Sequence, residues 1–158
     1  MMNIALSIAI AALISYLLGS CNFSIIVVRL LKNEDVRNFG SHNAGLTNTL
    51  RCFGKGCALL TLIGDLSKGV VAVTLSRCLC RLMEGGLSPD NDTHYIGYIA
   101  GFFAIIGHIF PIYYGFKGGK GVLVGVSTFI AVDPAIFFIL IAIFAVILAV
   151  SKYVSLSS

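Results

Sequence analysis

The chain has 158 residues, of which 58% are hydrophobic and only 11% are charged, and its mean hydropathy is +0.96. A soluble domain carries about 25% charged residues, so the composition excludes an ordinary soluble domain and predicts an integral membrane protein of single-domain length. The net charge of +4 does not call for nucleic acid, because basic residues beside membrane spans usually face anionic lipid or an anionic substrate.

The first apolar run predicts a membrane span with an extension. Ile4 to Leu18 is apolar, Gly19-Ser20-Cys21-Asn22 interrupts the run, and Phe23 to Leu31 resumes it. A span needs about 20 residues, so we expect one helix that bends at Gly19 and then continues.

Residues 32–56 are predicted to form the first polar loop. Within it, residues 40–51 are dense in amides, hydroxyls and glycines, with the sequence Gly-Ser-His-Asn-Ala-Gly-Leu-Thr-Asn-Thr-Leu-Arg. An ordinary connection does not need so many hydrogen-bonding side chains. This segment is therefore a candidate binding loop.

The second span, residues 57–82, contains Asp65 and Lys68. Charges inside a span cost several kcal/mol unless they are paired or hydrated, and a spacing of i, i+3 places both on one helical face. They form either a structural ion pair within the bundle or one wall of a polar site, and we favour the second.

An acidic, turn-rich loop at 83–94 precedes the third span, Tyr95 to Phe116. Pro111 is expected to kink the end of this helix. His108 then lies near the loop that follows. A histidine in this position is either a hydrogen-bonded structural group or a catalytic one.

The loop Lys117-Gly118-Gly119-Lys120-Gly121 brings two cations and three glycines together. Glycine lets the backbone approach a ligand closely and turn its N–H groups toward an anion. The spacing is not that of a P-loop. The segment is either a phosphate-binding loop or a basic loop that only orients a membrane protein.

The last two apolar runs, 121–132 and 135–150, are separated by Asp133-Pro134. The first is too short to cross about 30 Å of hydrocarbon as a helix. We expect two short tilted spans or a re-entrant pair. In total, the pattern predicts an all-α, polytopic transmembrane bundle with about five hydrophobic segments.

The distribution of Lys and Arg predicts the orientation. If the N-terminus lies outside the cell, the outer loops hold only Arg77 and Arg81, while Lys68 lies within a span. The cytoplasmic side then holds all the other basic residues: Arg29, Lys32, Arg37, Arg51, Lys55, Lys117, Lys120 and Lys152. Both unusual loops would face the cytoplasm and could line one site.

The chain shows no sequence pattern for a nucleophile, a metal or a cofactor. There is no Gly-x-Ser-x-Gly, and no histidine is followed five residues later by the Asp of the common lipid acyltransferase pattern. The five cysteines include no C-x-x-C pair, and the three histidines match no zinc spacing. We expect the cysteines to act as small hydrophobic residues. The polar residues instead suit a phosphorylated small molecule that meets a lipid at the membrane face.

From about Gly19 to Ser158, the chain resembles the bacterial membrane acyl-phosphate:glycerol-3-phosphate acyltransferases. The resemblance rests on the segment 40–51, on Asp65-x-x-Lys68-Gly69, and on Gly107-His108-x-Phe110-Pro111 followed by residues 116–121. It implies a helical enzyme of the cytoplasmic membrane that transfers a fatty acyl group from acyl phosphate to the 1-hydroxyl of glycerol 3-phosphate. The product is lysophosphatidate, an early intermediate of phospholipid synthesis. The implied partners are these two substrates and membrane lipid, with no cofactor.

The resemblance also implies roles for individual residues. The candidate catalytic residues are Ser41, His108 and Lys120. The candidate substrate-binding residues are Asn43, Gly45, Thr47, Asn48, Arg51, Asp65, Lys68, Lys117, Gly118, Gly119 and Gly121. Acyl phosphate is already activated, so positioning and charge neutralisation could suffice, with a substrate phosphate accepting the proton.

Three positions depart from the family pattern: Asn22, His42 and Leu46. The family's third motif does not occur in these residues, so we expect a single acyltransferase domain, residues 1–158, that lacks the family's C-terminal part. Two alternatives remain open at this point. One is a transporter or anion-channel subunit, which interrupted spans and intramembrane charges also fit, and the other is a non-catalytic remnant.

Overall fold

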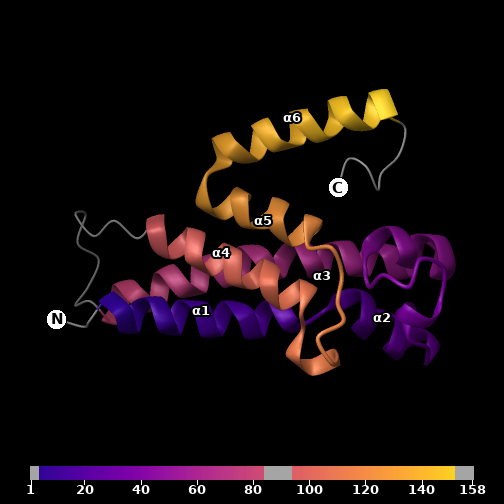
Figure 1. Cartoon of the computed structure of the whole chain (residues 1–158), viewed down its shortest axis with the longest axis horizontal. Helices are drawn as coiled ribbons and strands as arrows, with labels where there is room; N and C mark the ends of the chain where they lie inside the picture. Colours follow the sequence, from indigo (N-terminus) through magenta and orange to yellow (C-terminus); the bar gives the residue numbers. More distant parts are fainter. Residues whose placement is uncertain (1–3, 84–93, 152–158) are drawn as a thin grey trace.

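The computed structural model describes residues 4–83 and 94–151, and the regular elements within those ranges are all helical (Figure 1). The elements are α1 (Ile4–Ser20), α2 (Phe23–Lys32), η1 (Val36–Asn38), α3 (Leu46–Met83), α4 (His94–Ile109), η2 (Ile112–Tyr114), α5 (Val122–Val132) and α6 (Pro134–Ser151), where η marks a short 3₁₀ helix. The predicted all-α class is confirmed. The acidic loop predicted at 83–94 falls almost entirely outside the described residues.

Three segments are long and apolar enough to cross a membrane: Ala5–Lys32, Leu46–Met83 and Tyr95–Tyr114. Two shorter apolar helices follow, Val122–Val132 and Pro134–Ile147. These are the five hydrophobic segments expected from the sequence.

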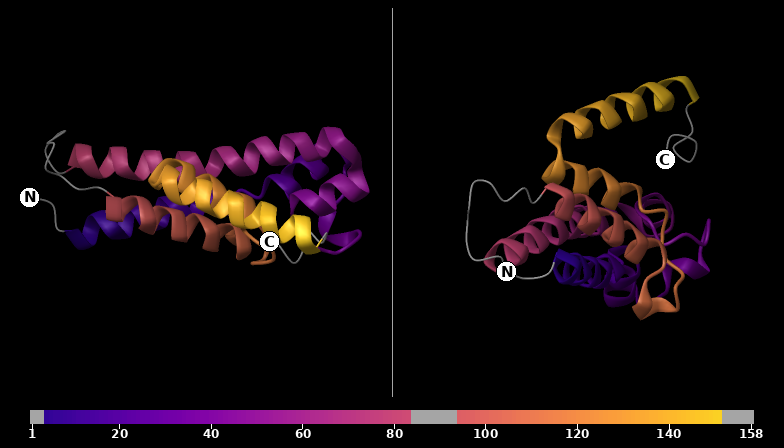
Figure 2. Two further views of the ribbon diagram at one scale, coloured as in Figure 1. Left: turned by 90° about the horizontal axis from the view of Figure 1, so that it is seen from above. Right: turned by 60° about the vertical axis from the view of Figure 1, so that its left-hand side comes forward.

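Helices α1, α3 and α4 lie side by side as the bundle, and α5 packs across α3 and α4 (Figures 1 and 2). Small side chains allow the close packing: Ala11, Ala72, Ala100 and Ala104 are fully buried. Helix α6 packs mainly against α5 and stands away from the bundle. The candidate site therefore lies where the bundle, α5 and α6 meet.

The first span is interrupted at Cys21 and Asn22, not at Gly19 as the sequence suggested. Gly19 stays helical, and its missing side chain makes room for the backbone carbonyl of Ala104 in α4. Asn22 ends the helix because its side chain caps α2: its Oδ1 accepts a hydrogen bond from the Ile25 amide at 3.2 Å. The break leaves main-chain carbonyls near the centre of the bundle without helical partners.

The predicted polar loop at 32–56 is shorter than expected, because α3 begins at Leu46. Thr47, Asn48 and Arg51 therefore lie on the first turns of a helix. The Thr49 amide donates to the Gly45 carbonyl at 3.0 Å, which closes the first turn. The polarity of Thr47, Asn48 and Arg51 suggested a loop, but these helical residues line the candidate site and do not face lipid. Gly54, with φ of +81°, kinks the helix before it enters the apolar part of α3.

The break predicted at Asp133-Pro134 is confirmed. Asp133 Oδ1 accepts hydrogen bonds from the amides of Ala135 at 3.0 Å and Ile136 at 3.2 Å, so it caps α6. Pro134 occupies the first helical position, where its missing N–H costs nothing. The chain can then turn sharply between α5 and α6.

The close contact at Gly19 predicts a large effect of one methyl group. We expect Gly19→Ala to destabilise the bundle by about 1–3 kcal/mol, because the new Cβ would meet the Ala104 carbonyl. Gly56→Ala is the matched control, since Gly56 is also helical and no atom lies within 4 Å of its Cβ position. Thermal unfolding in detergent measures both. Equal melting temperatures for the two variants would contradict the packing assigned to Gly19.

Candidate active site

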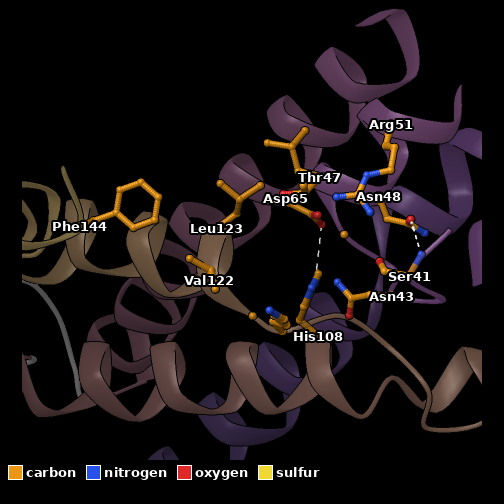
Figure 3. A pocket seen from close by; sticks show the side chains of 14 residues that line it. Ser41, Asn43, Thr47, Asn48, Arg51, Asp65, His108, Val122, Leu123 and Phe144 are labelled. Carbon is orange, nitrogen blue, oxygen red and sulfur yellow. Dashed lines mark hydrogen bonds and ion pairs between the residues drawn. The ribbon is translucent and has the colours of Figure 1, made fainter. Parts of the chain in front are cut away.

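A cavity of about 460 Å³ opens where five segments of the chain converge (Figure 3). The loop before α3, α3 itself (its first turns and Asp65) and the last turn of α4 form much of its polar side, and the loop before α5, the start of α5 and the middle of α6 complete it. Its lining residues are Ser41, Asn43, Gly45, Leu46, Thr47, Asn48, Arg51, Asp65, His108, Lys120, Gly121, Val122, Leu123 and Phe144.

The Asn48 side chain holds the loop before α3 in place. Its Nδ2 donates to the carbonyls of Val36 at 3.2 Å and Phe39 at 2.9 Å, and its Oδ1 accepts from the Ser41 amide at 3.0 Å. Gly40 has φ of +58° and packs against the same amide oxygen. Although Asn48 lines the cavity, its side chain forms most of its hydrogen bonds with the loop before α3. These bonds position Ser41 in the wall of the cavity.

Asp65, Lys68 and His108 form a buried charged cluster at the base of the cavity. The Lys68 ammonium lies 2.9 Å from Asp65 Oδ1 and 2.8 Å from His108 Nδ1. It also donates to the carbonyls of Gly19 at 3.1 Å and Cys21 at 2.9 Å, which the break in the first span sets free. The i, i+3 pair predicted from the sequence is confirmed, and it extends to a third residue on α4.

The lysine–glycine loop folds back onto the end of α4. The Gly118 amide donates to the Ile109 carbonyl at 3.0 Å, and the Gly119 amide donates to the His108 carbonyl at 3.1 Å. These amides satisfy the last carbonyls of the helix, so they do not point at an anion as the sequence suggested. A side chain on either glycine would collide with the main chain of His108 or Ala44, or with the His108 ring. The glycines therefore allow the loop to lie against His108.

The first turn of α5 lies beside the cavity and has backbone donors without helical partners. Gly121, at φ of +81°, starts the helix, and Val122 and Leu123 line the cavity directly after it. No side chain caps this helix, and the first amides of any α-helix lack intrahelical partners. Together with the partial positive charge at a helix N-terminus, they favour an anion beside Lys120.

Arg51 and Lys120 supply the cations of the cavity. Both line it and both are exposed, and no acidic partner is found for either within the described residues. Arg51 comes from the second turn of α3 and Lys120 from the loop before α5 (Figure 3 labels Arg51). Unpaired cations on two walls of one cavity suit a dianionic phosphate.

A second arginine, Arg37, ties the two loops together, and sequence reasoning gave it no role beyond orientation. Arg37 lies in η1, before α3. Its Nη1 donates to the carbonyls of Tyr114 at 2.8 Å and Lys117 at 3.1 Å, which belong to the segment before α5. Its Nε and Nη2 form a two-pronged contact with Asp35 at 2.9 and 2.7 Å. The hydrogen bond from Arg37 holds the pKa of the Asp35 carboxyl well below its usual range, and Asp35 in turn raises the pKa of Arg37.

The structure brings most of the expected site residues together, with four exceptions. Lys117, Gly118 and Gly119 are not among the cavity residues, and Lys68 lies behind Asp65 and His108. Four apolar lining residues were missed: Leu46, Val122, Leu123 and Phe144. Val122, Leu123 and Phe144 lie within apolar segments, where nothing in the sequence distinguishes them from residues that face lipid, and Leu46 is an apolar residue within the polar segment 40–51.

Comparison with known proteins decides the family. A family model described as glycerol-3-phosphate acyltransferase matches residues 9–158. The chain belongs to this family. Among its curated relatives, the glycerol-3-phosphate acyltransferase of Clostridioides difficile is 41% identical over 152 residues, which are 96% of this chain and 72% of the relative. That of Ureaplasma urealyticum is 40% identical over 97% of this chain and 62% of its own length.

Two crystal structures of PlsY (YgiH), an integral membrane glycerol 3-phosphate acyltransferase, share the fold. The glycerol 3-phosphate form has a TM-score of 0.76 and 32% identity over 96% of this chain and 70% of that one. The lysophosphatidic acid form has a TM-score of 0.73 and 28% identity over 96% and 69%. The chain is thus an integral membrane protein with several spans, and it matches about 61–73% of the length of these family members.

The contact between Asp35 and Arg37 predicts a dependence of stability on pH. The folded-state pKa of Asp35 lies below its unfolded-state value of about 3.9, so the pair stabilises the fold above about pH 4, and this contribution is lost as the pH falls. We expect Asp35→Asn to lower the melting temperature near neutral pH. The gap to the unmodified chain should shrink below about pH 4.

The matched control is Glu34→Gln, which removes the same charge from an exposed neighbour. It should change the melting temperature little at any pH. A gap between Asp35→Asn and the unmodified chain that stays constant through acid would contradict a role for the ionised carboxylate.

Proposed function

We propose that this chain transfers a fatty acyl group from acyl phosphate to the 1-hydroxyl of glycerol 3-phosphate, giving lysophosphatidate. The observation that carries the proposal is the cavity itself, which is lined both by the cations Arg51 and Lys120 and by apolar side chains. Membership of the glycerol-3-phosphate acyltransferase family supports the same reaction.

Glycerol 3-phosphate would bind on the polar side of the cavity. Arg51 would hold its phosphate, with Lys120 and the first turn of α5 available for a second phosphate group. Ser41, Asn43 and Thr47 line the same side and offer hydroxyl and amide groups to the glycerol. Hydrogen bonds from these groups would orient one hydroxyl for attack.

The acyl donor would enter from the apolar side. Leu46, Val122, Leu123 and Phe144 are its only purely hydrocarbon lining side chains among the described residues, and they come from three different helices. With its acyl chain along these residues, the donor would have its phosphate near Lys120 and its carbonyl near His108, which line the same cavity. The glycerol hydroxyl and the acyl carbonyl would then lie next to each other, where the polar and apolar sides of the cavity join.

The chemistry needs little from the protein beyond positioning. The glycerol oxygen forms a bond to the acyl carbon, the bond from that carbon to the phosphate oxygen breaks, and inorganic phosphate leaves. The hydroxyl proton passes to a phosphate oxygen. Lys120 neutralises the leaving phosphate, and His108 stabilises the carbonyl oxygen as it gains charge. Asp65 and Lys68 support His108 from α3.

The direct test is incubation of the purified chain with acyl phosphate and labelled glycerol 3-phosphate. We expect labelled lysophosphatidate and one inorganic phosphate per product. The double variant Arg51→Ala, Lys120→Ala is the control for adventitious activity. If the unmodified chain forms no more product than this control, the proposal fails.

The two lysines of the lysine–glycine loop are expected to differ in function, because Lys120 lines the cavity and Lys117 does not. Losing a charge-assisted contact to phosphate costs about 1.5–3 kcal/mol, so Arg51→Ala and Lys120→Ala should each weaken substrate binding about 10- to 100-fold. Lys117→Ala is the matched control: it removes the same charge from the same loop, but Lys117 is exposed and is not among the cavity residues. Michaelis constants for both substrates measure the effect. Equal, small changes in all three variants would point to an orienting role for the basic loop.

We infer further that the cavity opens to the cytoplasm and that the N-terminus lies outside, as the distribution of basic residues indicates. Single cysteines at Asp90 and Lys117, in a variant whose five native cysteines are replaced by Ala, test this orientation. An impermeant thiol reagent added to intact cells should label the first position and spare the second. Labelling of Lys117→Cys from outside would overturn the orientation.

A further inference from the structure

We propose that Lys68 is a positioning residue that holds His108 in the tautomer with its proton on Nε2, which makes His108 a hydrogen-bond donor to the substrate and prevents it from acting as a base. The role in tautomer selection follows from geometry alone. Its consequence for the substrate rests on the proposed acyl transfer.

The Lys68 ammonium is fixed by the groups around it. Four acceptors lie within 3.1 Å: the carbonyl oxygens of Gly19 and Cys21, Asp65 Oδ1 and His108 Nδ1. The side chain is 3% exposed, so bulk water does not compete for these contacts. Three N–H bonds serve four acceptors, and one hydrogen is shared. Only the charged amine can donate to the carboxylate and to both carbonyls at once.

This environment assigns the proton on His108. An ammonium nitrogen has no lone pair, so it can only donate to an imidazole nitrogen 2.8 Å away. Nδ1 must therefore be the unprotonated nitrogen that accepts. In a neutral imidazole the proton then resides on Nε2, because the hydrogen bond at one nitrogen sets the state of the other.

His108 lines the cavity where the reaction would occur. Its Nε2 lies against Gly119, the residue before Lys120, and a Cβ on Gly119 would collide with it. Within the described residues no hydrogen-bond partner of Nε2 is found, although His108 is only 4% exposed. Because this N–H has no protein partner and belongs to a residue that lines the cavity, it is available to a ligand oxygen.

The position of Asp65 makes the effect of Lys68 specific. Asp65 Oδ1 lies 3.8 Å from His108 Nδ1, too far for a hydrogen bond (dashed line in Figure 3). If the carboxylate bound Nδ1–H directly, as in a Ser-His-Asp triad, Nε2 would become a proton acceptor. Lys68 contacts both groups and prevents this arrangement. Asp65 and His108 could form a general base if they were hydrogen-bonded to each other. With Lys68 between them, His108 is instead a hydrogen-bond donor through Nε2.

The balance of the transfer step follows from this assignment. Nε2–H donates to the acyl carbonyl oxygen as it gains negative charge, and His108 keeps its proton throughout. The glycerol oxygen bonds to the acyl carbon, the bond between that carbon and the phosphate oxygen breaks, and the hydroxyl proton leaves on a phosphate oxygen. No proton is transferred to the imidazole.

Nitrogen-15 NMR of histidine-labelled chain in detergent, near neutral pH, tests the tautomer without any substrate. The spectrum of His108→Gln identifies the His108 signals. We expect a protonated Nε2 and an unprotonated Nδ1. In Lys68→Met, where Asp65 becomes the nearest charged group, we expect Nδ1 to gain a proton. Ser76→Ala is the matched control, since it removes a buried polar contact from the same helix and should leave the His108 signals unchanged.

A protonated Nδ1 in the unmodified chain, or an unchanged tautomer in Lys68→Met, would overturn the proposal. If Lys68→Met does not fold, the double variant Lys68→Met, Asp65→Asn removes the unpaired buried carboxylate. There we expect the Nδ1 and Nε2 signals to report a mixture of tautomers, and a pure Nε2–H form would count against Lys68.

The kinetic consequence is a separate measurement. Loss of one donor to the developing oxyanion typically lowers kcat about 10²- to 10³-fold, so Lys68→Met should reduce kcat while the KM for glycerol 3-phosphate changes little. An expected tautomer in a chain that makes no lysophosphatidate would refute the proposed function and leave the role of Lys68 intact. Full activity of Lys68→Met would refute its role in the reaction.

Discussion

One buried ammonium connects the packing of the bundle to its candidate chemistry. Lys68 on α3 contacts the carbonyls left free where α1 breaks from α2, and it also contacts His108 on α4. A charge at this depth costs several kcal/mol unless its partners are in place, so the break in the first span and the register of α4 are both constrained by it. The close contacts at Gly19 and Gly107, which meet backbone of α4 and α1, bring these elements within reach of one side chain.

The polar residues around the cavity have two different roles: some hold the loops in place, and others are available to a ligand. Asn48 donates to backbone carbonyls, and Arg37 donates both to backbone carbonyls and to the Asp35 carboxylate, so the two side chains hold two loops at one edge of the bundle. Arg51 and Lys120 line the cavity instead, and no acidic partner of either is found among the described residues. The proposed function needs both groups: rigid loops to fix the walls, and unpaired cations to bind phosphate.

Much of this arrangement could be predicted from the sequence, and the exceptions have physical causes. The pairing of Asp65 with Lys68 follows from helical spacing, because i and i+3 share a face whatever the rest of the chain does. The contact of Lys68 with His108 depends on how α3 and α4 cross, which no local pattern encodes. The amides of Gly118 and Gly119 were expected to face an anion, but they donate hydrogen bonds to the free carbonyls at the end of α4. The apolar half of the cavity gave no signal, because in a membrane protein Phe144 looks like any residue that faces lipid.

The described residues of the cavity offer donors and cations to the substrates, and among them we find neither an activated nucleophile nor a base, so transfer should take place in one step. Mass spectrometry of the intact chain, mixed with acyl phosphate alone, tests this most directly. We expect the mass of the chain to stay unchanged, with acyl transfer starting only when glycerol 3-phosphate is added. An acyl adduct on Ser41, or on the exposed Cys52 beside Asn48, that glycerol 3-phosphate then consumes would contradict direct attack and establish a two-step reaction.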